Sequence, residues 1–309
     1  MTIRVKVDPS NPGQFFACCG LLELADRLWE GAEGWYVSRE SMFCLVGRKP
    51  TMLSALISNL QQVGLTGELS PALQKEREEL EERRRQLKKV AKQLEPEMED
   101  RRKELGTLLR SGAISIGQPF NLRLDWWQSD SEQIPKTWAG SQQVLRIANS
   151  ALNATQQAFA TESPFDYACV MHPGSDESEG AEPEKGKVEP FYFDARRGTT
   201  AMPLDIGFSP DSLKLVSLAY PAVEFLSLVG LQRFRPMPTA ARQTYDYQVW
   251  TRPLAASIAP IAVCGLLADV HGQTFRFENA FRTDQKKHKA FKAATPVFRR
   301  NNGQSARAI

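Results

Sequence analysis

The segment that most constrains the fold is NPGQFFACCGLLELADRLW, residues 11–29, in which apolar residues recur at helical spacing. Asn11 suits the N-cap of a helix, and Pro12 suits the first helical position, where its missing N–H costs nothing. The segment therefore predicts a buried helix around which the remaining elements must pack. Cys18 and Cys19 are expected to be small packing residues rather than a redox or metal pair.

Patterning along the rest of the chain predicts an α+β fold, with mixed sheets, packed helices and an inserted antiparallel coiled-coil-like helical hairpin. Strands are expected at 1–7, 35–37, 42–46, 113–116, 120–127, 165–171, 245–250 and 274–277. Helices are expected at 50–63, 137–155, 210–234 and 260–270. We divide the chain into an N-terminal α+β part (1–70), the hairpin (71–110), the main α+β body (111–280) with a disordered acidic loop near 172–190, and a basic C-terminal segment (281–309).

The hairpin is predicted from an abrupt change of composition. Residues 75–104 contain 11 basic and 10 acidic residues, and Leu73, Leu80, Leu87 and Leu94 recur at seven-residue intervals. Pro96 would end one helix or begin the next. Helices at 71–94 and 96–110 could bury these leucines against each other. A single kinked, solvated helix is the alternative.

The chain lacks the usual sequence signatures of catalysis. It has no phosphate-binding loop, no G-x-S-x-G and no H-E-x-x-H, and its three histidines and five cysteines have no metal-ligand spacing. Asp194, on a predicted strand beside Arg196 and Arg197, is expected to be an ion-paired structural group; a nuclease using Asp194 is a weaker hypothesis. We therefore predict that the protein is not an enzyme and needs no cofactor or metal.

Nucleic-acid binding is better supported, by groups that commonly contact phosphates. Residues 271–309 contain nine Lys and Arg against two acids, so the C-terminal end is the basic end. Free amides at the start of the first helix, residues 11–14, are a further candidate for a phosphate. The predicted contacts are Arg196, Arg197, Thr199, Arg233, Arg235, Arg242, Arg252, Lys286, Lys287, Lys289 and Lys292.

Each group has an alternative interpretation. Arg196, Arg197 and Thr199 could form a polar turn in which Arg197 pairs with Asp194. The aromatic residues interleaved with Arg233 to Arg252 could face the core, which is the stronger expectation for Tyr247 and Trp250. The one-sign cluster 282–300 favours contact with RNA or DNA over a simple solvated face, where mixed signs are usual.

Several phrases resemble a known family. Residues 7–25 (VDPSNPGQFFACCGLLELA) look like the opening signature of a subunit of type I-U, also called I-G, CRISPR effector complexes. The blocks FDARRG at 193–198, GLQRFRP at 230–236 and WTRPL at 250–254 resemble further parts of the same protein. The similarity runs from residue 7 to about residue 254, through individually short matches.

The resemblance implies a non-catalytic, large-subunit-like component of a Cascade-type antiviral surveillance complex. Its partners would be guide RNA, target DNA, other effector subunits and a recruited helicase-nuclease that cuts the target. Such a subunit would help to read the motif flanking the target, although the charged hairpin and the short chain depart from larger members of this class.

The alternative from another functional class is a scaffold that docks protein partners through the hairpin and touches no nucleic acid. The opening residues lack a signal peptide, and no apolar run has the length of a membrane helix, so we expect a cytoplasmic protein without a membrane partner.

Overall fold

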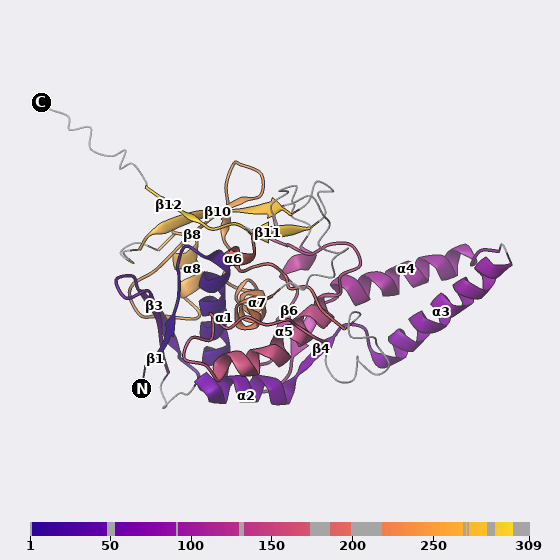
Figure 1. The fold of residues 1–309 in the computed structure, drawn as a ribbon, viewed down its shortest axis with the longest axis horizontal. Helices are drawn as coiled ribbons and strands as arrows, with labels where there is room; N and C mark the ends of the chain where they lie inside the picture. The colour runs from indigo at the N-terminus through magenta and orange to yellow at the C-terminus, as the bar shows by residue number, and fades with distance from the viewer. Residues whose placement is uncertain are drawn as a thin grey trace, which may run out of the picture.

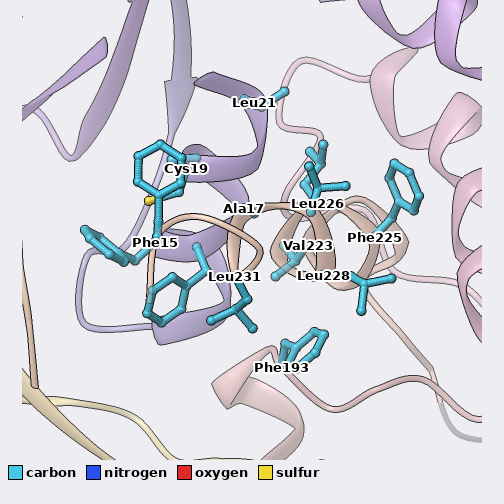
Figure 2. Packing of buried hydrophobic residues seen from close by; sticks show 14 of the residues in the cluster. Phe15, Ala17, Cys19, Leu21, Phe193, Val223, Phe225, Leu226, Leu228 and Leu231 are labelled. Atoms are coloured by element: carbon cyan, nitrogen blue, oxygen red, sulfur yellow. The ribbon is translucent and has the colours of Figure 1, made fainter. Parts of the chain in front are cut away.

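The computed structural model describes residues 2–47, 53–90, 92–129, 133–173, 186–198, 218–267, 270, 272–282 and 288–298. Its centre is a crossing of two buried helices, α1 (Pro12–Trp29) and α7 (Pro221–Gly230) (Figure 1). α1 begins as the sequence predicts, since the Asn11 side chain caps it and Pro12 follows. Figure 2 shows apolar side chains of both helices gathered in one cluster with Phe193.

Glycines allow these two helices to approach closely. A Cβ at Gly20 of α1 would lie 2.0 Å from the carbonyl oxygen of Leu226, and one at Gly230 of α7 would lie 2.1 Å from that of Phe16. Both distances are far below van der Waals contact, so only glycine fits at either position. The helix α5 (Val144–Phe159) packs on α7 as well. α7 is therefore enclosed on several sides, and all of its residues are buried.

A four-stranded antiparallel sheet brings three strands from residues 3–46 together with one strand from residues 254–255. Its order is β1-β3-β2-β9, and its strands are β1 (Ile3–Lys6), β2 (Glu33–Val37), β3 (Met42–Val46) and β9 (Leu254–Ala255). Gly34 of β2 pairs with Leu254 of β9, and its carbonyl accepts a hydrogen bond from Nε1 of Trp250 at 2.7 Å. Residues 1–70 and 111–280 therefore share a sheet as well as a core.

A five-stranded sheet is formed by strands within residues 237–297. Its strand order is β11-β10-β8-β7, and β12 also pairs with β10. Its strands are β7 (Met237–Pro238), β8 (Thr244–Gln248), β10 (Thr274–Phe281), β11 (Lys289–Phe291) and β12 (Thr295–Val297). Tyr247 and Trp250 are buried, as expected, and both rings contact the Phe15 ring.

A third antiparallel sheet, β4-β5-β6, lies beside α5 and α2 (Leu53–Val63). Its strands are β4 (Leu65–Gly67), β5 (Ile114–Ile116) and β6 (Leu122–Leu124). The chain between β4 and β5 leaves the body and returns as two helices, α3 (Pro71–Lys89) and α4 (Pro96–Ser111) (Figure 1). A short 3-10 turn at Trp126–Gln128 follows β6.

The two helices of this insertion are connected by ion pairs. Arg101 and Arg102 of α4 contact Glu76 and Glu81 of α3 at 2.8 and 2.7 Å. Leu73, Leu80 and Leu87 are only half-buried, and no side chain of α3 is buried. The helices form an antiparallel hairpin, whereas coiled-coil packing of its leucines stays a prediction.

The α+β class is as predicted. The sheets were expected to be mixed, but every strand pair in the described residues is antiparallel, and several local assignments were also wrong. The helix expected over 137–155 begins at Val144, because residues 136–137 bond to β10 and β11 instead. Residues 165–171 form only an isolated bridge from Cys169 to Ala219. The helix expected at 260–270 is the short α8 (Ala259–Val263). Most of the acidic loop near 172–190 lies outside the described residues. Within the described part of the chain, no helix has the length and apolarity needed to span a bilayer.

Candidate nucleic-acid interface

The N-terminus of α1 is filled by the chain itself. Oδ1 of Asn11 accepts hydrogen bonds from the amides of Gly13 at 3.1 Å, Gln14 at 3.4 Å and Ala195 at 3.0 Å. Nδ2 of Asn11 donates to Asp194 at 2.9 Å, and both side chains are buried. The prediction of a phosphate site at residues 11–14 was therefore wrong, because the amides already have acceptors and the nearby anion is Asp194.

A second buried carboxylate, Glu224 of α7, lies beside Asp194. Its oxygens accept the backbone N–H groups of Phe193 at 3.2 Å and Asp194 at 3.3 Å. Burial disfavours its charged form and raises the pKa of Glu224 to about 8. Because these side chains hold the 193–195 segment against α1 and α7 and are closed off from solvent, they form a structural network.

Arg196 belongs to the same network. Its Nε and Nη2 donate to the Asp194 carboxylate at 2.9 and 2.7 Å, and its Nη1 donates to Asp166 at 2.8 Å. Nη2 also donates to the carbonyl of Phe165, and the guanidinium carbon lies 3.4 Å from the centre of the Tyr220 ring. The polar-turn alternative paired Asp194 with Arg197, whereas in the structure Asp194 pairs with Arg196. Asp194 and Arg196 start the short helix α6 (Ala195–Gly198) rather than ending a strand.

The predicted contact residues between Arg233 and Arg252 differ in burial and in ion pairing. Arg233 forms an ion pair at 3.1 Å with Glu23, a buried residue of α1 that also binds Arg27 at 2.6 Å. Arg233 therefore fastens the segment after α7 to α1. Arg235 and Arg252 are exposed. The structure thus does not bring these arginines into one site.

A basic cluster forms elsewhere, at one end of the five-stranded sheet. Its first part surrounds the ring of Tyr192, which lies just before the buried network. The guanidinium carbon of Arg282 is 3.3 Å from the ring centre, and that of Arg197 is 5.9 Å away. The Tyr192 hydroxyl donates to the carboxylate of Glu189. Tyr192 adopts a left-handed backbone conformation with φ of 67°, so its ring is held at a cost in strain.

The second part of the cluster lies on the adjoining strands. Lys289 of β11 pairs with Phe281 of β10, and its Nζ lies 5.2 Å from the Phe281 ring centre. Burial, and then the charge of Arg242, lower the pKa of Lys289. The turn carrying Arg242 is bound to β10, since the Asn279 amide donates to the Gln243 carbonyl at 2.8 Å. We define the basic cluster as Arg197, Arg242, Arg282 and Lys289.

Three cations of this cluster differ in their charge pairing from several other cations of the protein. Arg276 binds Asp246 at 2.7 Å, Arg123 binds Glu68 at 2.9 Å, and Arg101 and Arg102 of the hairpin are paired as described above. Within the described part of the chain, Arg242, Arg282 and Lys289 form no ion pair. Among the same residues, the buried Nε of Arg282 has no hydrogen-bond partner. Arg282 and Lys289 are half-buried and Arg242 is exposed. Cations without a counter-ion are suited to an external anion.

The remaining predicted contacts can also be located. Lys292 lies just after β11, where its backbone N–H binds the Glu278 carbonyl at 2.9 Å, and its side chain is half-buried. Thr199, Lys286 and Lys287 lie outside the described residues. Tyr192 was not predicted as part of the site. It is one aromatic residue in an apolar segment, and the sequence does not indicate that folding brings arginines to its ring.

A pocket of about 270 Å³ opens between β7 and the chain that follows β6. Its walls are mainly apolar, with Trp126, Ile134, Leu231, Met237 and Cys264 among them, and the polar residues Ser129, Gln133 and Arg235 also line it. Trp126 is fixed by hydrogen bonds, because its Nε1 donates to the Leu228 carbonyl at 3.0 Å. Arg235, predicted as a phosphate contact, thus lies at a pocket rather than in the basic cluster.

Comparisons with known protein families, curated proteins and solved structures find no match to this chain.

Proposed function

We propose that the protein binds nucleic acid through the basic cluster, as a non-catalytic subunit of a type I CRISPR surveillance complex. The supporting observation is that three cations without ion pairs among the described residues lie at one end of the five-stranded sheet: Arg282 against the Tyr192 ring, and Lys289 against the Phe281 ring with Arg242 near it. Guanidinium and ammonium groups neutralise phosphates, so these cations are suited to a nucleic-acid backbone, while the Tyr192 ring is itself buried and positions Arg282. The assignment to the CRISPR system depends on the sequence resemblance.

In this role the basic cluster would hold the backbone of guide RNA or of the opened target DNA, while a separate helicase-nuclease cuts. The enclosed position of Asp194 supports a non-catalytic role for that residue, since a general base must reach the proton it abstracts. Arg196 and Arg233 would act by keeping the fold intact rather than by touching phosphate.

The test is binding of a fluorescent single-stranded RNA or DNA by anisotropy over a series of salt concentrations. Arg282→Gln and Lys289→Gln should each weaken binding and reduce the slope of log K against log salt by about 0.7, the value for one phosphate contact on a single strand. Lys6→Gln, an exposed lysine of β1, is the matched control and should leave the slope unchanged. Equal slopes for all four proteins would contradict the proposal.

A scaffold role for the hairpin is the second candidate. It is favoured by one observation, the projection of α3 and α4 from the body with no buried side chain on α3 (Figure 1). Reversing the charge of exposed Arg83 and Arg85 should then reduce co-purification with the other effector subunits. Nucleic-acid affinity of the isolated protein would stay constant under the same change. Loss of nucleic-acid affinity instead would count against a pure scaffold.

A further inference from the structure

The 270 Å³ pocket lies close to the basic cluster along two short stretches of chain. Pro135 lines the pocket, and two residues later the Thr137 carbonyl accepts the Lys289 amide at 2.9 Å. Two extended residues span at most about 7 Å. Pro238 of β7 also lines the pocket, and the turn after it carries Arg242. A ligand bound at the cluster can therefore also reach the pocket, because only a few residues of chain separate the two.

The size and walls of the pocket suit one planar ring system. A cavity of about 150 Å³ with apolar walls accepts benzene, so 270 Å³ has room for a larger aromatic heterocycle. The Trp126 indole and the rigid rings of Pro135, Pro236 and Pro238 supply flat apolar surface. Trp126 is already held in place, which lowers the entropic cost of binding.

The polar groups of the pocket match the edge of a nucleobase. Gln133 brings an amide, Ser129 a hydroxyl and Arg235 a guanidinium, and such groups bond to the donors and acceptors on base edges. Arg235 forms no ion pair with a carboxylate among the described residues, and it adds a positive charge between the pocket and solvent. A nucleotide joins an apolar flat base to an anionic phosphate, which is the combination that pocket and cluster offer.

We propose that this pocket takes one unstacked base of the single strand whose phosphates bind the basic cluster. The inference rests on the proposed nucleic-acid function and adds to it: single strands would bind in preference to duplexes, because the bases of a duplex stay stacked. Part of the affinity would come from the base and therefore persist at salt concentrations that screen the phosphates.

The first test compares an intact single strand of about 12 nucleotides, a length typical of single-strand sites, with an abasic strand of equal phosphate number. We expect the intact strand to bind about tenfold more tightly, since stacking of one base has effects of this order. Cys264→Phe, which places a ring in the pocket, should bring the intact strand down to the affinity of the abasic one. Val90→Phe on the exposed end of the hairpin is the control, because Val90 is 63% exposed and far from the pocket in the chain.

A second measurement uses the unmodified protein and so avoids any folding defect of the variant. Alkylation of Cys264, followed by peptide mass spectrometry, should slow when the intact strand is bound and remain fast with the abasic strand. Equal affinity for both strands, with no protection of Cys264, would overturn the pocket inference and leave phosphate binding in place. Absence of binding to either strand would overturn the proposed function itself.

Discussion

Gly20→Ala is the sharpest test of the helix crossing that organises the core. The added Cβ would lie 2.0 Å from the Leu226 carbonyl oxygen, where ordinary contact begins near 3.4 Å. α1 must therefore move away from α7 by more than an ångström, and both helices are buried along most of their length. Overpacking costs about 1–3 kcal/mol and sometimes more, while alanine regains about 1 kcal/mol of helix propensity. Because the atom that the Cβ meets belongs to the backbone, the overpacking cost should reach the upper end of this range, about 3 kcal/mol, and the net loss in the free energy of unfolding should be about 2 kcal/mol.

Urea denaturation followed by far-UV circular dichroism measures this loss. Gly106→Ala in α4 is the matched control, because its Cβ would meet only the flexible Arg110 side chain at 3.2 Å, and it should be neutral or stabilising by up to about 1 kcal/mol. Adding Gly230→Ala to Gly20→Ala should cost less than the two single changes together, since one displacement of the helices relieves both contacts. A Gly20→Ala protein as stable as wild type would refute the close crossing.

Two further predictions concern the buried network. Arg196→Ala should lower the free energy of unfolding by about 3 kcal/mol in urea denaturation, because it leaves the Asp194 carboxylate buried without its cation; unchanged stability with weakened nucleic-acid binding would instead make Arg196 a phosphate contact. Glu224 has a folded-state pKa of about 8, above the 4.5 of an ordinary glutamate, so the folded protein binds more protons between these values and its stability should fall as pH rises from about 5 to 8. Glu224→Gln should flatten that dependence, and an unaltered pH profile would show that Glu224 does not titrate there.

The parts of the fold that sequence could predict are those set by local pattern. Asn11 and Pro12 mark the start of α1 because capping and the fixed φ of proline act within one turn. The short apolar run at 42–46 and the alternation at 245–248 mark β3 and β8, since both are local patterns typical of strands. The strands β11 and β12 were missed, because short, basic or proline-containing segments become strands only through pairing with β10.

The candidate site depends on contacts that no local pattern encodes. Arg196 and Arg197 are adjacent and equivalent in the sequence, yet only Arg196 is bound between Asp194 and the Tyr220 ring. Lys289 was predicted as a nucleic-acid contact from the basic tail, and this stays a prediction; the structure places it near Arg242. Its neighbours Arg242 and Tyr192 come from segments distant in sequence, which only the pairing of β8, β10 and β11 brings alongside.

The order in which the chain leaves the ribosome gives the α1–α7 crossing another consequence. α1 is made with most of its side chains apolar, whereas α7, which covers it, and β9, which pairs with β2, follow about 200 residues later. At roughly 5–20 residues per second this delay lasts on the order of 10–40 s. Throughout that time the central helix lacks α7, its most extensive native partner, and has only nearby elements such as β2 and α2 to pack against. We therefore expect the apolar surface of α1 to need shielding in the nascent chain until α7 has been made.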